Sequence, residues 1–155
     1  MKVISAITID ELTDVLINLV EDDSLEFEYE VNENAATGFI EIYCKMFDTE
    51  FFITPLGAGP FYEDLLLTSF CSAYLDPDIL CTEFNSRHKF ASAVPLTIES
   101  DDGSDEDDYQ IIEVEKLVLL AGGVTDKHLE ATIKLWTGML MHAEQLFNGI
   151  PAESD

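Results

Sequence analysis

Basic residues are scarce in this sequence. Seven Lys and Arg stand against 32 Asp and Glu, and the net charge of the 155 residues is −25 at pH 7. A protein with this charge repels the phosphates of nucleic acids and the head groups of anionic lipids. We therefore expect neither a nucleic-acid partner nor a membrane partner.

Long apolar runs are also lacking. The longest uncharged stretches are Phe51 to Tyr62 and Leu65 to Leu75, and both are shorter than the roughly 18 residues that a membrane-spanning helix needs. The first nine residues mix Ser and Thr with short apolar groups, unlike the apolar core of a secretory signal. The sequence predicts a soluble, cytoplasmic protein.

Cysteine is rare, with only Cys44, Cys71 and Cys81 in the chain. An odd number of cysteines without a Cys-x-x-Cys spacing indicates neither a disulfide framework nor a zinc site. We expect buried, reduced thiols.

Apolar residues are plentiful, at 47% of the chain with 10% aromatic. This is enough for a packed core in spite of the charge. The length is typical of one core, so we predict a single domain over residues 1–155. It includes an acidic loop at 99–109 and a flexible tail at 149–155.

The first third of the chain changes from helical to strand periodicity. Thr8 and Glu11 form a capping-box pattern, and the apolar residues that follow up to Val20 recur at helical spacing. Apolar residues then alternate with Glu over 25–31, which is typical of a strand with one wet face. We expect an antiparallel sheet, with a returning strand at 39–47 and with 51–54 either continuing that strand or forming another.

The second third is less uniform. Residues 65–74 are rich in apolar and aromatic residues, too uniformly so for a surface helix, which favours a central strand but leaves a buried helix as the alternative. Asp76 and Pro77 are a good helix N-cap and first residue, and they predict a helix over 78–87. Strands are expected at 90–98, where an edge strand tolerates Pro95, and at 111–120.

The last helix is predicted over 126–147, with Thr125 as its cap. It carries two apolar stripes. The first contains Leu129, Ile133, Trp136, Leu140, Ala143 and Phe147, and the second contains Leu135, Met139 and Leu146. One stripe packs on the sheet, and the second needs either a neighbouring element or a partner. The predicted fold is α+β, an antiparallel sheet flanked by helices in the order α-β-β-(β)-β-α-β-β-α.

Motifs for catalysis and cofactor binding are missing from the sequence. Gly57 and Gly59 lack the third glycine of a dinucleotide-binding loop, because Tyr62 stands there. His128 and His142 are separated by about four helical turns, too far apart to share a metal. The acidic run at 99–108 does not fit a calcium loop. We expect no catalytic residue, no cofactor and no metal site.

Two segments carry a family resemblance. Phe84-Asn85-Ser86-Arg87-His88-Lys89-Phe90-Ala91 and Leu119-Leu120-Ala121-Gly122-Gly123-Val124-Thr125 resemble motifs of the YbjN family of bacterial sensory transduction regulators. The chain departs from the family at Thr82, where an earlier Asn is common. The resemblance implies an α+β fold similar to that of type III secretion chaperones, which are small, acidic and commonly dimeric protein-binding proteins.

The candidate interaction or structural residues follow from these motifs and from the last helix. They are Phe84, Asn85, Arg87, His88, Phe90, Gly122, Gly123, Trp136 and Met139. Asn85, together with Arg87 and His88, is expected to satisfy free carbonyls where the short helix ends. Contact with a ligand is the alternative role for this segment.

We therefore expect a non-enzymatic interaction or regulatory module that binds a partner protein or peptide on its sheet and helix surfaces, as a homodimer. One alternative is a dedicated type III secretion chaperone. Another, from a different class, is an enzyme or small-ligand binder without a recognisable motif.

We predict that the acidic loop is dispensable for folding, because its seven carboxylates repel one another and it has no apolar anchor. Replacing residues 100–107 with a short Gly-containing turn should leave the melting temperature unchanged or raise it at low salt. Thermal unfolding followed by circular dichroism checks this. A clear fall in melting temperature would show that the loop has a structural partner or binds a cation.

Overall fold

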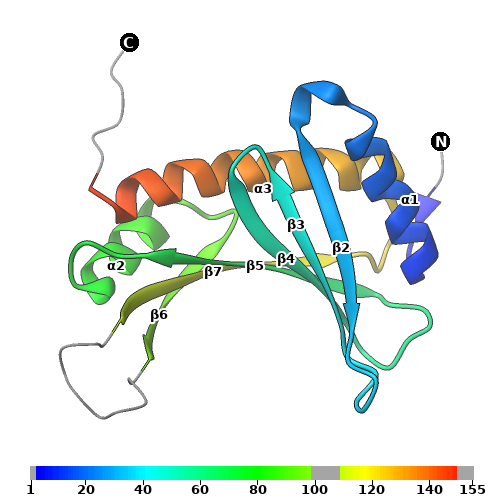
Figure 1. Ribbon diagram of the computed structural model, residues 1–155, viewed down its shortest axis with the longest axis horizontal. Helices are drawn as coiled ribbons and strands as arrows, with labels where there is room; N and C mark the ends of the chain where they lie inside the picture. Colours follow the sequence, from blue (N-terminus) through cyan, green and yellow to red (C-terminus); the bar gives the residue numbers. More distant parts are fainter. Residues whose placement is uncertain (1–2, 99–108, 150–155) are drawn as a thin grey trace. The chain divides into compact units, whose positions relative to one another are not determined.

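The computed structural model describes residues 3–98 and 109–149, and it has an α+β fold with three helices and a six-stranded antiparallel sheet (Figure 1). The strand order in the sheet is β2-β3-β4-β5-β7-β6. The helices are α1 (Ile9–Val20), α2 (Pro77–Arg87) and α3 (Asp126–Phe147). The strands of the sheet are β2 (Phe27–Glu33), β3 (Ile40–Met46), β4 (Thr49–Leu56), β5 (Asp64–Ser72), β6 (Ser92–Ile98) and β7 (Tyr109–Leu119).

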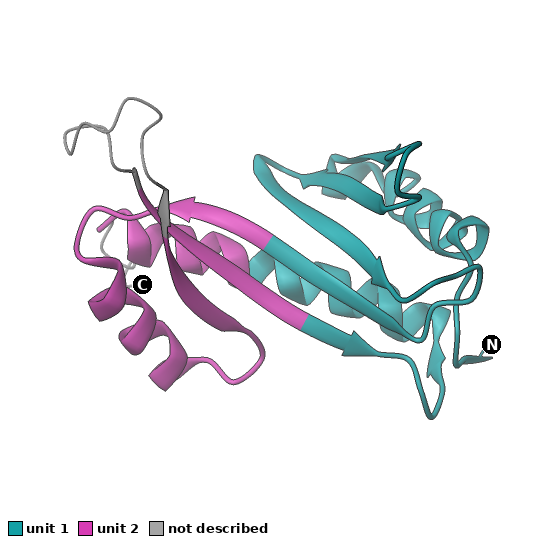
Figure 2. Cartoon of the chain, turned by 90° about the horizontal axis from the view of Figure 1, so that it is seen from below, with its two compact units in different colours: residues 1–68, 117–138 teal, residues 69–116, 139–155 magenta. Residues whose placement is uncertain are grey.

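The chain divides into two compact units (Figure 2). The first contains the chain up to Thr68 together with Leu117–Gly138, and the second contains Ser69–Lys116 and the chain from Met139 onward. The boundaries fall inside β5, β7 and α3. The single domain remains a prediction. The acidic loop lies outside the described residues apart from its last residue, Tyr109, and so does the tail from 150.

The capping box at the start of α1 is confirmed. The Glu11 N–H donates to the Thr8 hydroxyl at 3.1 Å, and the Glu11 carboxylate accepts the Thr8 N–H at 3.2 Å. The helix buries the side chains of Leu12, Val15, Leu16 and Leu19. Local hydrogen bonds therefore start the helix, and its apolar stripe holds it in place.

The alternating segment forms β2, which pairs with β3 in an antiparallel hairpin, Phe27 lying opposite Met46. The strand starts two residues later than predicted. A short 3-10 helix, η1 (Asp23–Leu25), precedes it, and Glu26 has a left-handed φ of 50° that ends the helical turn. The turn before β2 therefore includes Leu25 and Glu26, and the alternation alone assigned Leu25 and Glu26 to the strand.

Residues 64–72 form the strand β5, so the predicted central strand is confirmed and the buried helix is wrong. Leu65 and Leu67 are fully buried on one face, opposite Pro55 and Ile53 of β4. The strand is rich in apolar residues because β5 lies inside the sheet, between β4 and β7.

The core of the first unit lies between one face of the sheet and α3. The rings of Phe51 on β4 and Trp136 on α3 meet edge to face, with centroids 6.3 Å apart. Both side chains are fully buried. Within the described residues the indole N–H of Trp136 has no hydrogen-bond partner, so packing rather than hydrogen bonding fixes this side chain.

In the second unit α2 starts as predicted. Asp76 is the N-cap and accepts a hydrogen bond from the Asp78 N–H at 3.0 Å, while Pro77 is the first helical residue. Phe84 is fully buried and its ring lies 5.7 Å from that of Phe147 on α3. This ring contact anchors the short helix against α3, and Leu80 and Cys81 of α2 are buried as well.

The last helix has the predicted bounds, and the Thr125 hydroxyl accepts the His128 N–H at 2.9 Å. Its first apolar stripe is buried throughout. The second stripe is divided, because Met139 is buried and Leu146 is half-buried, whereas Leu135 is 64% exposed. Burial within the chain therefore covers part of the second stripe and leaves Leu135 open.

One small sheet was not predicted. The strands β1 (Val3–Ile4) and β8 (Val124–Thr125) pair antiparallel, with Val3 opposite Thr125. Gly123 has a φ of +91°, and a Cβ on it would lie 2.9 Å from the Val3 side chain. The glycine that follows the long strand β7 is thus needed for both its backbone angle and its close contact.

All three cysteines are free and buried, as predicted. Burial is the main cause that raises the pKa of Cys71 to about 12, and burial also raises the pKa of Cys44 and of Cys81. Because the reactive form of cysteine is the thiolate, these thiols stay protonated and unreactive near neutral pH.

Across residues 3–98 and 109–149, the helices are too short or too polar to cross a membrane. In the same ranges no three His, Cys, Asp or Glu side chains lie together in a way that would hold a metal ion.

Candidate functional site

The junction between α2 and β6 contains five of the predicted residues. Phe84 lies at its centre, where the ring of His88 stacks on it with centroids 4.5 Å apart. The His88 N–H donates to the Phe84 carbonyl at 2.9 Å and closes the helix. Both aromatic residues therefore hold the end of α2 in place.

Asn85 pairs with a strand. Its amide nitrogen donates to the Ala93 carbonyl at 3.0 Å, and its amide oxygen accepts the Ala93 N–H at 2.8 Å. Ala93 belongs to β6, an edge strand, and its backbone groups point away from β7 toward Asn85. The side chain takes the position that a further strand would occupy, instead of bonding the carbonyls at the end of α2 as predicted.

Arg87 has a separate partner. Its guanidinium lies 2.7 Å from the Glu83 carboxylate, one turn back on the same helix, and both side chains are well exposed. Arg87 therefore makes a surface ion pair, which contributes little to stability. The predicted role of Arg87 at the helix end does not fit this contact.

The ring and the carbonyl of Phe90 both contact the Lys116 ammonium. The Lys116 ammonium lies 3.9 Å from the centre of the Phe90 ring and donates to the Phe90 carbonyl at 3.0 Å. This combination of a cation–π contact and a hydrogen bond orders the chain just before β6.

The remaining predicted residues do not join this junction. Gly122, Gly123 and Trp136 belong to the first unit, whereas Met139 and the junction belong to the second. The glycines have left-handed φ values that a turn requires, and Trp136 and Met139 are buried in the core. These four residues are structural in this fold.

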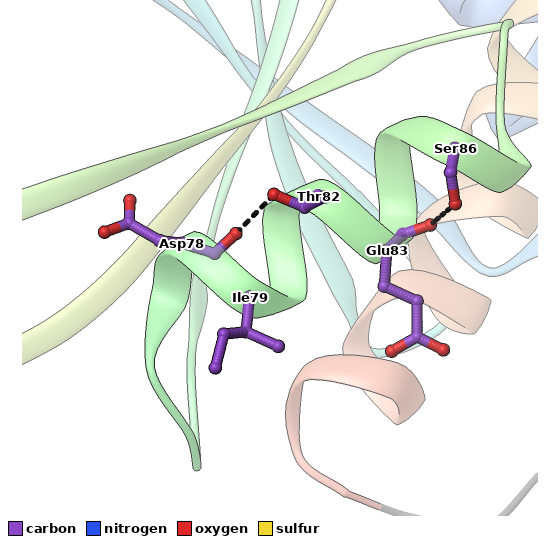
Figure 3. A pocket seen from close by; sticks show the side chains of 5 residues that line it. All are labelled: Asp78, Ile79, Thr82, Glu83 and Ser86. Atoms are coloured by element: carbon purple, nitrogen blue, oxygen red, sulfur yellow. Dashed lines mark hydrogen bonds between the residues drawn. The ribbon is translucent and has the colours of Figure 1, made fainter.

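The second unit has a shallow hollow of about 400 Å³ on α2 (Figure 3). Its lining residues are Asp78, Ile79, Thr82, Glu83 and Ser86. The Thr82 hydroxyl donates to the Asp78 carbonyl at 2.8 Å, and the Ser86 hydroxyl donates to the Glu83 carbonyl at 2.7 Å. The two hydroxyls thus bond carbonyls of the same helix, and the Glu83 carboxylate is paired with Arg87. The hollow offers the apolar side chain of Ile79 and the carboxylate of Asp78.

A second candidate is the face of the sheet that points away from α3. In the first unit, Phe51 faces α3, so its neighbour Phe52 and the alternate positions that follow it, Thr54 and Leu56, point to the other side. Leu66 on β5 lies opposite Thr54 on β4 and belongs to the same outer face.

Strand β7 extends this outer face. The Leu120 N–H donates to the Glu63 carbonyl at 2.9 Å, and the antiparallel register that starts there brings Leu117 opposite Leu66. Leu117 is 48% exposed and Leu119 is 60% exposed. We name this group the open-face patch, formed by Phe52, Leu56, Leu66, Leu117 and Leu119.

The sequence analysis missed the patch, although a signal was present. Residues 117–120 are consecutive apolar residues at the end of a strand that alternates with Glu113 and Glu115. Loss of the alternation means that both faces of the strand become apolar. Only the position of α3 shows which face stays open.

The patch has an acidic border on β3 and β4. Tyr43 lies opposite Phe52 with ring centroids 5.9 Å apart, and its hydroxyl donates to the Glu50 carboxylate at 2.8 Å. This hydrogen bond to Glu50 is the main cause that raises the pKa of Tyr43 to about 12. The arrangement keeps a neutral phenol beside an apolar surface.

No family model matches this chain, and no curated protein matches it. The resemblance to the YbjN family therefore stays a prediction that depends on the two motifs around Asn85 and Gly122.

We predict that Asn85→Ala destabilises the fold by about 1 kcal/mol or more, because two backbone groups of Ala93 lose their partner. Arg87→Ala is the matched control on the same helix, and its exposed ion pair should contribute less than about 0.5 kcal/mol. Chemical denaturation of both variants checks this. Equal stability of Asn85→Ala and wild type would refute the structural role.

Proposed function

We propose that this protein is a non-enzymatic, cytoplasmic interaction module that binds a partner protein through the open-face patch. The observation that carries the proposal is the exposure of Leu117 and Leu119 on a strand whose other face is buried. Exposed apolar side chains that gather on one face usually mark a binding surface.

The net charge of the chain limits the classes of partner that it can bind. Against a net charge of −25, a protein or peptide with basic residues is attracted over several ångströms, whereas nucleic acids are repelled. The apolar patch supplies contact area, and the acidic surface around it supplies the preference for a basic partner.

A regulatory role is what the resemblance to the YbjN family adds to this proposal. Among the residues that carry the resemblance, Asn85 bonds α2 to β6, and Phe84 packs α2 against Phe147 of α3. They fix the second unit, whereas the open-face patch belongs to the first, and neither is assigned to contact the partner.

We predict that the double variant Leu117→Thr/Leu119→Thr captures at least tenfold less of its protein partner than wild type does. Threonine keeps the strand but removes the apolar surface. The measurement is affinity capture from extract of the native cells with quantitative mass spectrometry. Val94→Thr, an equally conservative change at an exposed strand position in the second unit, should leave capture unchanged.

Two outcomes would contradict this proposal. One is a wild-type protein that enriches no protein at all, and the other is a partner that the double variant captures as well as wild type does. Enrichment of a single exported protein would favour the alternative of a dedicated secretion chaperone.

We further predict a homodimer, because Leu135 leaves part of the second stripe of α3 exposed. Light scattering at micromolar concentrations should give about twice the monomer mass of 17.3 kDa. Leu135→Gln should shift the mass toward the monomer. A wild-type mass equal to the monomer mass would reject the dimer.

A further inference from the structure

The two edge strands of the six-stranded sheet differ in whether their outward backbone groups are hydrogen-bonded. At one edge lies β6, where Asn85 occupies the outward backbone groups of Ala93. At the other edge lies β2, which among residues 3–98 and 109–149 pairs with β3 alone. An edge strand with free backbone groups is a template for a further strand.

Hydrogen bonds of the β2–β3 hairpin show which backbone groups of β2 point outward. The Asn34 N–H donates to the Phe39 carbonyl at 2.8 Å. Hydrogen-bonded positions alternate along an antiparallel pair, so Glu28, Glu30 and Asn32 bond to β3. Tyr29, Val31 and Glu33 therefore turn their N–H and C=O groups away from the sheet. Among residues 3–98 and 109–149 no hydrogen bond fills these groups.

The side chains along this edge alternate in character. Glu28 and Glu30 are exposed on the face that points away from the core, while Tyr29 and Val31 lie on the other face. Lys45 lies opposite Glu28 on β3. In the described part of the chain no strand lies on the outer side of β2 that could supply a cation to the two carboxylates.

This alternation selects the occupant of the edge. A second copy that paired through the same edge would place Glu28 and Glu30 of the two chains next to each other, and like charges on neighbouring strands repel. A strand that alternates Lys or Arg with apolar residues would place cations beside both carboxylates and apolar side chains beside Tyr29 and Val31.

We propose that the free edge of β2 binds an extended segment of a partner protein in which Lys or Arg alternates with apolar residues. The segment joins the sheet as a further strand and bonds the outward groups of Tyr29, Val31 and Glu33. This inference depends on the proposed function, because it assigns a class of partner to a protein-binding module.

The test uses a fluorescein-labelled peptide of four Lys-Val repeats and fluorescence anisotropy at low ionic strength. We expect the repeat peptide to bind at least tenfold more tightly than a peptide of the same composition with its lysines in one block. Methylation of alternate peptide nitrogens should abolish binding, because it removes the donors that strand pairing requires.

Two variants of the protein separate strand pairing from general attraction. Glu28→Lys/Glu30→Lys should weaken the Lys-Val peptide at least tenfold and should bind a Glu-Val repeat instead. Asp14→Lys/Glu21→Lys changes two exposed carboxylates of α1 and its cap by the same charge, and it should retain the preference for the Lys-Val peptide.

Val31→Pro is a further variant that tests strand pairing even if the charge reversal at Glu28 and Glu30 disturbs the fold. The Val31 N–H points outward and takes no part in pairing with β3, so proline at this edge position leaves the hairpin bonds in place. Binding of the Lys-Val peptide should be lost, and bound peptide should slow amide exchange at Tyr29 and Glu33 in wild type.

Equal binding of the block peptide, unchanged binding by Glu28→Lys/Glu30→Lys, or an unchanged exchange rate at Tyr29 would overturn the proposal. The open-face variants are separate from this edge. Failure to capture a natural partner through Leu117 and Leu119 would therefore count against the proposed function, and failure of the peptide would count against the β2 edge.

Discussion

The structure depends on covering one face of a twisted sheet with a long helix. In the first unit this covering is concentrated at the contact between Phe51 and Trp136, two of the largest fully buried side chains. The buried indole N–H of Trp136 has no hydrogen-bond partner within the described residues. Such a group costs about 1–3 kcal/mol when buried, so the surrounding apolar packing must outweigh it.

Once one face of the sheet is covered, its other face and its two edge strands still present groups that can bind. At the β6 edge a side chain bonds the outward backbone groups, since the Asn85 amide donates to the Ala93 carbonyl and accepts the Ala93 N–H. The β2 edge carries Glu28 and Glu30 instead. Charge prevents pairing with identical chains while leaving the backbone groups open, and this difference is why we assign the binding of a further strand to β2 alone.

The apolar outer face and the acidic surface act together in the proposed function. Leu117 and Leu119 expose apolar surface whose burial against a partner is favourable. The net charge of −25 favours encounters with basic partners. The hydroxyls in the hollow on α2 are bonded to carbonyls of the same helix, as with Thr82 and Asp78.

Local interactions made much of the fold predictable from the sequence. The capping pair Thr8 and Glu11 and the Asp76-Pro77 start of α2 are made by neighbours in the chain, so their residue types are sufficient to place the helices. The alternation over 25–31 likewise predicted a strand, and the structure has one at Phe27–Glu33. These features need no knowledge of distant residues.

Tertiary structure alone decided the contacts between distant segments. The pairing of Val3 with Thr125 joins two strands of two residues each, too short to leave a periodic pattern. Asn85 bonds Ala93 rather than its own helix because β6 presents an open edge at that point. The second stripe of α3 is divided between a buried Met139 and an exposed Leu135. The spacing of these residues shows that both lie on one stripe, but burial depends on which elements pack there, and the sequence of the helix does not contain that information.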